Sequence, residues 1–329
     1  MKTTELDYEL PEELIAQRPL PRRDASRLLV YDRETGETRR RVFSELAGEL
    51  PARTLVVVND TRVVPARLHL KRPGGGETEV LLVERRNGVV WEALARPSRR
   101  LRPGMRLASA GGAADPAPGG SGEGDVELLE ALGDGRWLVR LTGEPAGAAP
   151  LPPYIRASLD DPERYQTVYA EEAGSAAAPT AGLHFTPELL RGLDVERVTL
   201  HVGLDTLRAV AAAELEAHEL HGERYRVAPA AWERIRSAPH VTGIGTTTVR
   251  VLETLASGGP LEGRTDLFVT PGFSFERVDA LVTNFHLPRS SLLALVMAFT
   301  GVEETRTLYA LAVAERYRFY SFGDAMLVR

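Results

Sequence analysis

Three histidines in the sequence lie in short polar strings and could transfer protons. His184 follows Gly182-Leu183, His201 ends an apolar run, and His286 precedes a Leu-Pro pair. An unperturbed imidazole titrates near neutral pH, so a histidine can act as general acid or general base. We expect His184 to be the first candidate, because the small residues before it leave its backbone room. The alternative for each histidine is a structural hydrogen bond that only holds its turn.

A second kind of string is suited to holding a ligand. Asn59-Asp60-Thr61-Arg62 directly follows the apolar run 55–58. The carboxyl ends of strands in α/β sheets open into the ligand crevice, where this cluster could bind hydroxyl and carboxylate groups. The alternative is an Asx turn followed by a surface arginine.

A glycine- and threonine-rich string, residues 243–250, lies between a predicted strand and a predicted helix. Gly245, Thr246 and Thr247 would place free backbone N–H groups at the helix start, where an anion can bind. The string lacks the third glycine of GxGxxG and the Gly-Lys-Ser/Thr ending of a P-loop. An ordinary helix with a threonine cap is the equally weighted alternative.

Metal binding is the weaker interpretation of the pair His218 and His221. Their spacing is HxxH, and no HExxH-type pattern accompanies it. The sequence contains no cysteine, which excludes disulfides and thiolate metal sites. A lone HxxH is more often a solvated helix face, so we expect no metal.

Charge is unevenly distributed along the 329 residues. Residues 1–110 contain 21 basic and 16 acidic residues, residues 111–329 contain 19 and 30, and the net charge is −6. The window 96–106 holds five arginines. Such clusters neutralise phosphates and stack on bases, so the window favours RNA contact, with a solvated surface as the alternative. The candidate RNA-binding residues are Arg96, Arg99, Arg100 and Arg102.

Changes of pattern along the chain indicate which elements position these residues. Residues 1–62 and 154–329 alternate between strand-like and helix-like runs. Residues 64–142 instead contain short strands around Asn-Gly and Asp-Gly turns, without helical periods, which is typical of a small barrel or sandwich. Residues 111–124, rich in Gly, Ala and Pro, predict a loop.

The fold class we expect is α/β, with a mixed α/β main domain interrupted by a small all-β, barrel-like domain. The main domain would consist of residues 1–64 plus 151–329, and the inserted domain of residues 65–150. The main-domain elements that the pattern predicts are strands at 27–31, 55–58, 195–202, 224–227, 266–269 and 278–282, and helices at 230–237, 246–256, 290–299 and 302–317.

The distribution of apolar residues predicts where the protein resides. The longest apolar run, residues 292–299, is too short to cross a bilayer. The first 17 residues are acidic and lack the apolar core of a signal peptide. We therefore expect a soluble, cytoplasmic protein that acts as a monomer.

Taken in order, these strings resemble one protein family over nearly the whole chain. The matching strings are Phe43 and residues 59–68, 151–155, 164–170, 178–186, 200–203, 245–250, 279–288 and 317–326. The sequence is similar to the S-adenosylmethionine:tRNA ribosyltransferase-isomerases of queuosine biosynthesis. Composition and periodicity do not name this activity, which enters through the resemblance alone.

The resemblance implies that S-adenosylmethionine is a substrate rather than a resident cofactor. Its ribosyl group would be transferred to 7-aminomethyl-7-deazaguanine at the tRNA wobble position and isomerised, giving epoxyqueuosine in tRNA, adenine and methionine. A base must remove a proton from the carbon beside the sulfonium, and donors must help adenine depart. The target base is accessible because anticodon loops present single-stranded bases.

The resemblance also assigns residues to roles. The acid–base groups would be His184, His201, His286, Asp60 and Asp279. The groups binding S-adenosylmethionine would be Asn59, Arg62, Gly182, Gly245, Thr246, Thr247 and Asn284. We expect one pocket to contain Asp60, His184, His201, Thr246, Asn284 and His286.

Two departures from the family pattern concern local geometry. After Gly203 the family commonly continues with Gly-Thr-Phe, whereas residues 204–207 read Leu-Asp-Thr-Leu. The helix expected before Leu151 is shortened to residues 143–150. Two other functions stay open: a tRNA-binding protein without catalysis, and an S-adenosylmethionine-dependent RNA methyltransferase, which would release S-adenosylhomocysteine.

Overall fold

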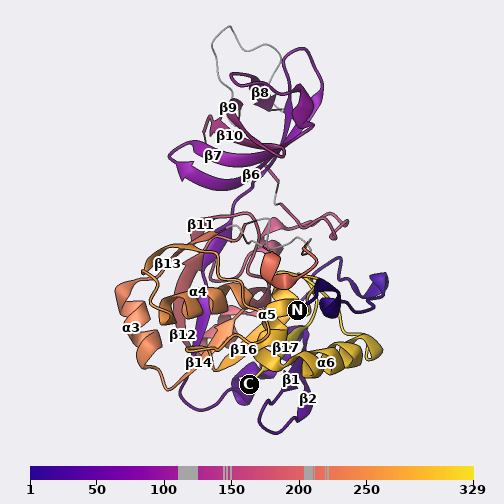
Figure 1. Ribbon diagram of the computed structural model, residues 1–329, viewed down its shortest axis with the longest axis vertical. Helices are drawn as coiled ribbons and strands as arrows, with labels where there is room; N and C mark the ends of the chain where they lie inside the picture. Colours follow the sequence, from indigo (N-terminus) through magenta and orange to yellow (C-terminus); the bar gives the residue numbers. More distant parts are fainter. Residues whose placement is uncertain are drawn as a thin grey trace. The chain divides into compact units, whose positions relative to one another are not determined.

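The computed structural model describes residues 1–109, 125–143, 145, 147–148, 150–203, 210, 212–218, 220 and 222–329. The chain forms two compact units (Figure 1). One unit consists of Met1–Thr61, Pro152–Glu172 and Ala178–Arg329, and the other of Arg62–Leu151 and Ala173–Ala177. The predicted loop 111–124, the departure at 204–207 and His221 lie outside the described residues.

A nine-stranded mixed sheet forms the centre of the first unit, which confirms the α/β fold class. Its four central strands, which carry most of the candidate residues, run parallel to one another. In spatial order the strands are β15 (Glu262–Thr265), β13 (Glu223–Arg226), β12 (Asp194–Leu200), β3 (Thr54–Asn59), β14 (His240–Ile244), β16 (Ala280–Asn284), β17 (Ala325–Val328), β1 (Arg27–Tyr31) and β2 (Thr38–Val42).

The burial of each strand follows from its place in the sheet. Every residue of β3 is buried, as expected for a β-branched run in the middle of a covered parallel sheet. The predicted strand at 266–269 is wrong, because the strand beside β13 is β15 and residues 266–269 follow it without regular structure. Strand β17 was not predicted, although it pairs with both β16 and β1.

The helices of this unit begin at residues with recognisable helix-start chemistry. Thr186 accepts a hydrogen bond from the Leu189 N–H at the start of α2, and Ser290 accepts one from Leu293 at the start of α5, as capping side chains do. The helices are α1 (Leu46–Glu49), α2 (Pro187–Arg191), α3 (Pro229–Ser237), α4 (Thr246–Ala256), α5 (Ser291–Thr300) and α6 (Val302–Ala314).

One face of the sheet is covered by short turns rather than long helices. Phe43, Ala181 and Phe185 pack there in one apolar cluster with Ala280 and Val282 of β16. Successive strand residues point to opposite faces, so residue 284 points to the same face of the sheet as Val282. This is the face that the turns cover.

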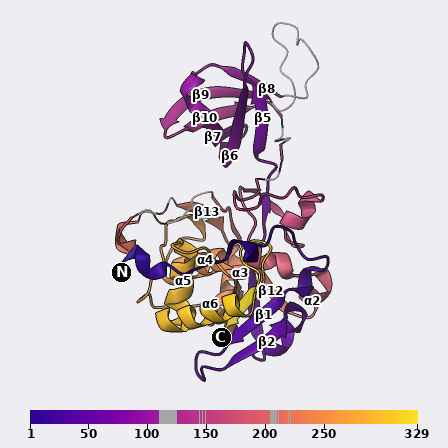
Figure 2. The same ribbon diagram turned by 90° about the vertical axis from the view of Figure 1, so that its right-hand side faces the viewer.

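The second unit is a closed six-stranded barrel (Figure 2). Its interior is filled by alternate apolar side chains, including Trp91 and Trp137, as small barrels require. The strands, in order around the barrel, are β10 (Arg136–Leu141), β7 (Val90–Arg96), β6 (Glu77–Asn87), β5 (Arg67–Lys71), β8 (Arg106–Ser109) and β9 (Val126–Gly133). The chain passes from one unit to the other within β4 (Thr61–Val63) and β11 (Glu172–Ser175).

Candidate active site around His184

The parallel strands bring several predicted site residues to one edge of the sheet. Asn59 ends β3, His201 follows β12, Gly245 follows β14 and Asn284 ends β16. Parallel neighbours have their carboxyl ends at the same edge, where ligands of α/β sheets bind. The antiparallel β17 and its parallel neighbour β1 begin at this edge, so Ser26, which precedes β1, lies there too.

His184 is buried in the turn that covers this edge. Its side chain is only 4% exposed, its Nδ1 is hydrogen-bonded to the Ser26 hydroxyl at 2.8 Å, and its ring lies 4.8 Å from the Phe43 ring. Burial lowers the pKa of His184 to about 4, an effect that the Asn284 side chain opposes. The imidazole is therefore neutral at pH 7, and its Nε2 is the atom left for proton transfer.

Asn284 presents a second unpaired polar atom beside this histidine. Its Nδ2 donates to the Tyr320 carbonyl at 2.9 Å, and its side chain is 1% exposed. Within the described part of the chain, neither Asn284 Oδ1 nor His184 Nε2 has a hydrogen-bond partner that meets ordinary geometry. Buried polar atoms are nearly always paired, and the group that acts on the imidazole from this side is the Asn284 side chain, which raises the pKa of His184. This weakly satisfied pair makes the His184 side of the edge a candidate place for a ligand.

Gly182 fits the turn because it has no side chain. A Cβ at this position would lie 2.0 Å from the Tyr169 hydroxyl and 2.8 Å from Thr167 Cγ2. The Tyr169 hydroxyl is buried without a hydrogen-bond partner among the described residues, and burial raises its pKa. Gly182 therefore brings the His184 turn against Tyr169, and the close approach is one that any larger residue would disrupt.

Asp60 lies at the same edge, at the end of β3. Its carboxylate accepts a hydrogen bond from the Thr199 hydroxyl at 2.7 Å, and it is 8% exposed. Burial raises the pKa of Asp60, which the Thr199 hydrogen bond opposes. A carboxyl group with a raised pKa is suited to proton transfer near neutral pH.

Asn59 joins two strands to the start of α4. Its Nδ2 donates to the Leu200 carbonyl at 3.0 Å and to the Thr247 hydroxyl at 3.3 Å, and its Oδ1 accepts from the Leu200 N–H at 3.0 Å. Gly245 precedes α4 with φ at 84°, and no side chain caps the helix start. The first N–H groups of α4, including that of Thr246, therefore lie at the ligand edge.

His201 lies in a different pocket of the same unit. Its Nδ1 is hydrogen-bonded to the Thr61 hydroxyl at 2.8 Å. The pocket, with about 890 Å³ of empty volume, is also lined by Thr199 and by arginines of β13 and β15. The sequence-predicted residue Arg62, on β4, is half-buried.

His286 and Asp279 are not brought to His184. His286 Nε2 is hydrogen-bonded at 2.6 Å to the hydroxyl of Thr283, which points to the opposite face of β16 from Asn284. Burial lowers the pKa of His286 to about 3. Asp279 precedes β16 at its other end, where its carboxylate accepts from the Val241 N–H at 2.7 Å. The expectation of a single pocket does not hold for His286, nor for His201, which lines a different pocket from His184.

The barrel carries the arginine window on its surface. All four candidate arginines are exposed, and Arg99 and Arg100 belong to a short turn at Ser98–Arg100. In the described part of the barrel, none of the four forms an ion pair with a carboxylate. The remaining two are Arg96, at the end of β7, and Arg102, whose guanidinium donates to the Leu101 carbonyl at 2.9 Å.

Metal and membrane interpretations find no support in the described residues. Those residues contain no group of three or more His, Cys, Asp or Glu side chains that could hold a metal ion. The His218 ring instead packs edge-on against Phe268, with centroids 5.5 Å apart. None of the described helices has the length and apolar character needed to cross a membrane.

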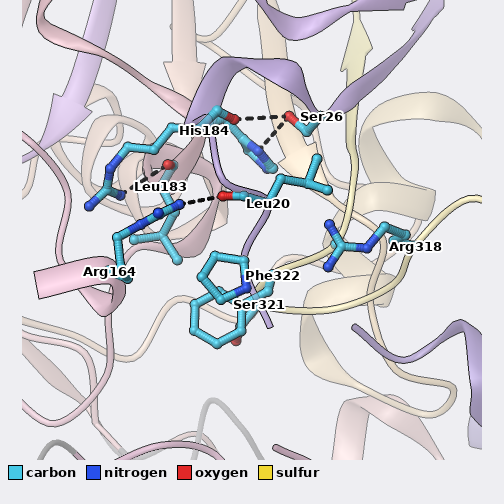
Figure 3. A pocket seen from close by; sticks show the side chains of 11 residues that line it. Leu20, Ser26, Arg164, Leu183, His184, Arg318, Ser321 and Phe322 are labelled. Atoms are coloured by element: carbon cyan, nitrogen blue, oxygen red, sulfur yellow. Dashed lines mark hydrogen bonds between the residues drawn. The ribbon is translucent and has the colours of Figure 1, made fainter. Parts of the chain in front are cut away.

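The pocket that opens beside His184 contains residues that sequence reasoning missed. It lies wholly within the first unit and has a cavity volume of about 20 Å³, which is room for about one water molecule (Figure 3). Arg164 and Arg318 line it, and both belong to strings that carried the family resemblance without a role being assigned to them. The only sign in the sequence that these arginines belong to the site is that each string contains an arginine beside several aromatic residues.

Known proteins are similar to this chain over its whole length. Residues 3–328 match the model of a family described as queuosine biosynthesis protein. A relative from Rubrobacter xylanophilus is 52% identical over 100% of this chain and 98% of its own length, and one from Carboxydothermus hydrogenoformans is 49% identical over 100% of both. Both are named S-adenosylmethionine:tRNA ribosyltransferase-isomerase.

A solved structure is similar over the same extent. The crystal structure of S-adenosylmethionine tRNA ribosyltransferase from Thermotoga maritima is 36% identical, with a TM-score of 0.55, over 99% of this chain and 100% of that one. The fold and the family model together define a queuosine biosynthesis protein. The chain belongs to the S-adenosylmethionine:tRNA ribosyltransferase-isomerase family, which confirms the resemblance seen in the sequence.

Proposed function

We propose that the protein transfers and isomerises the ribosyl group of S-adenosylmethionine onto 7-aminomethyl-7-deazaguanine in the tRNA wobble position. The products are epoxyqueuosine in tRNA, adenine and methionine. Membership of the family supports this activity. The single structural observation that carries it is the buried contact between the side chains of His184 and Asn284 at the ligand edge of the sheet, in which neither His184 Nε2 nor Asn284 Oδ1 has a hydrogen bond of ordinary geometry.

His184 acts as the base in this proposal. Burial keeps its imidazole neutral, so Nε2 can take the proton from the carbon beside the sulfonium, whose positive charge makes that proton acidic. The Ser26 hydroxyl fixes the ring through Nδ1. Asp60, with its raised pKa, supplies a second group for proton transfer as adenine departs.

The backbone at the same edge supplies contacts to the substrate. The uncapped N–H groups of Thr246 and Thr247 at the start of α4 offer donors to an anionic or hydroxyl group, whereas the Gly245 N–H donates to the Val282 carbonyl at 2.8 Å. Asn284 offers its free Oδ1 to a hydroxyl of the ribose. These assignments keep the ligand on the turn-covered face, where His184 lies.

The barrel arginines contact tRNA phosphates in this proposal. Exposed guanidinium groups without carboxylate partners are available to phosphates. Replacing Arg99 and Arg100 with Ala should weaken tRNA binding and reduce its salt dependence by a slope of roughly 0.7–0.9 per lost contact. The control is Arg140→Ala on the same barrel, because Arg140 is already paired with Glu127 at 2.8 Å. An unchanged slope in the double variant would place the RNA-binding surface elsewhere.

Product analysis tests the reaction itself. The protein is incubated with S-adenosylmethionine and tRNA carrying the modified base, and the small-molecule products are separated. Adenine and methionine released in equal amounts support the proposal. S-adenosylhomocysteine instead would identify a methyltransferase, and tRNA binding without any product would identify a binding protein.

A further inference from the structure

The pocket beside His184 is surrounded by positive charge. Arg23, Arg164 and Arg318 line it together with His184 and Ser26. The three arginines come from segments far apart in the sequence. Figure 3 shows Arg164 and Arg318 on different sides of the pocket, with His184 at its edge.

Backbone carbonyls are the only hydrogen-bond acceptors that the described chain gives these guanidinium groups. Arg23 donates to the carbonyls of Leu183 at 3.1 Å and Glu163 at 2.8 Å. Arg164 donates to the carbonyls of Pro21 and Leu20, at 3.2 and 2.5 Å, and Arg318 to that of Arg18. Among the described residues, no carboxylate lies within 4 Å of any of the three guanidinium groups.

Two donor atoms around the pocket are buried and unpaired in the described structure. They are Arg164 Nε and Arg318 Nη1, neither of which has a partner among the described residues. A buried donor without an acceptor is costly, and two of them around one pocket point to an acceptor group that the folded chain does not supply.

The electrostatics of the pocket agree with this interpretation. Burial lowers the pKa of Arg23, and repulsion from Arg164 lowers it further, while Asp161 and Glu163 oppose the shift. Burial likewise lowers the pKa of Arg318, opposed by Asp324. Converging cations repel one another, and an anion placed between them removes that repulsion.

We propose that Arg23, Arg164 and Arg318 form an oxyanion subsite next to His184. The inference rests on the proposed function for the identity of the anion, which is either a backbone phosphate of the tRNA or the carboxylate of the methionine part of S-adenosylmethionine. Both offer several oxygen acceptors, which planar guanidinium groups bind with two parallel hydrogen bonds. A group held there lies beside the imidazole that takes the proton.

Inorganic phosphate tests the subsite independently of the reaction. The melting temperature is measured with and without phosphate for the wild type, Arg164→Gln and Arg318→Gln. The control is Arg156→Gln, whose side chain is 79% exposed and pairs with Glu12, so that it reports the general stabilisation by salt. Phosphate should raise the melting temperature of the wild type and the control more than that of the two subsite variants. Equal increases in all four proteins would overturn the subsite.

Affinity measurements then identify the source of the anion. Titrations use S-adenosylmethionine, its decarboxylated analogue and tRNA. If the subsite holds the carboxylate, Arg164→Gln and Arg318→Gln weaken S-adenosylmethionine binding by about tenfold or more and leave the analogue unchanged. If it holds a phosphate, they weaken tRNA binding and reduce its salt slope by roughly 0.7–0.9. Unchanged affinity for all three ligands would contradict the proposal.

Two further comparisons keep these outcomes separable. Arg318→Lys retains the charge but loses the planar fork, so it should recover part of the affinity that Arg318→Gln loses. A variant that is merely misfolded would lose affinity for the decarboxylated analogue as well. If the wild type released no adenine, the proposed function would fail, while a stabilisation by phosphate that the wild type and the control show and the subsite variants lose would still support an oxyanion site.

Discussion

Two buried histidines lie on opposite faces of β16, and they differ in the hydrogen-bond partners of their rings. His184 meets the face of Asn284, and its Nε2 has no partner in the described structure. His286 belongs to the opposite face, where its Nε2 is hydrogen-bonded to the Thr283 hydroxyl at 2.6 Å. Burial lowers the pKa of both, to about 4 and about 3.

Both histidines are buried and have a lowered pKa, so they differ only in whether their polar atoms have hydrogen-bond partners. The His286 backbone N–H donates to the Tyr309 hydroxyl at 3.0 Å, and its carbonyl accepts from the Tyr8 hydroxyl at 2.5 Å. The Nε2, the backbone N–H and the carbonyl of His286 thus all have partners within the protein. A buried titratable group indicates chemistry only when one of its atoms is left free.

The largest effect we expect is from His184→Ala. Loss of the base should lower the turnover number for adenine release by roughly 10²–10⁴, with little change in the affinity for S-adenosylmethionine. Steady-state kinetics and equilibrium binding on the same preparation separate the two quantities. Near-normal turnover in a folded variant would leave His184 with a structural role only.

A smaller effect is expected from crowding the turn that carries His184. In Gly182→Ala the new Cβ overlaps the Tyr169 hydroxyl, which should cost about 1–3 kcal/mol in the free energy of unfolding. Tyr169→Phe removes the overlapping oxygen, so the double variant should recover part of this loss, as urea unfolding of the single and double variants would reveal. Additive losses would show that the contact between these two residues is not what limits the turn.

On the opposite face, replacement should affect stability instead of turnover. His286→Ala removes the hydrogen bond to Thr283 and should lower the free energy of unfolding by about 1–3 kcal/mol, while the turnover of the folded fraction stays within tenfold of normal. Tyr8→Phe, which removes one hydrogen bond to the same turn, should cost about 1 kcal/mol. A hundredfold loss of turnover in a folded His286→Ala protein would remove the distinction between the two faces.

The last expected effect concerns pH, where the two histidines should act alike. A histidine whose folded-state pKa lies below its ordinary value of about 6.5 binds fewer protons in the folded protein than in the unfolded chain. Between pH 4 and 6.5 the free energy of unfolding should therefore rise with pH, and fall as pH decreases through this window. Replacing either His184 or His286 by Gln should reduce the slope by up to about 1.4 kcal/mol per pH unit. A slope unchanged by the His184 replacement would show that this imidazole is not buried in its neutral form.

Much of the fold could be predicted because its signals are local. The β-branched run that became β3, the helix start at Thr246 and the Asp134-Gly135 turn between β9 and β10 each act within a few residues. Strand β17 could not be predicted in the same way. It is short and terminal, and it is a strand because β16 and β1 pair with it from both sides.

The sequence predicts which types of residue form the site, but not on which face of the sheet each of them lies. Asn284 and His286 lie two residues apart in the same string. Their side chains nevertheless lie on opposite faces of β16, because the strand ends at Asn284. The three subsite arginines come from residues 23, 164 and 318, and their convergence depends on the packing of the whole unit. Each of them, considered alone in the sequence, is an ordinary surface arginine.

Histidine-ring NMR during a titration with S-adenosylmethionine tests the central claim most directly, namely that the ligand binds on the His184 face of β16. The two rings are assigned by the signals that disappear in His184→Ala and His286→Ala. The account predicts that the ligand shifts the His184 ring signals and leaves those of His286 in place. Shifts of the His286 ring with an unchanged His184 ring would contradict it.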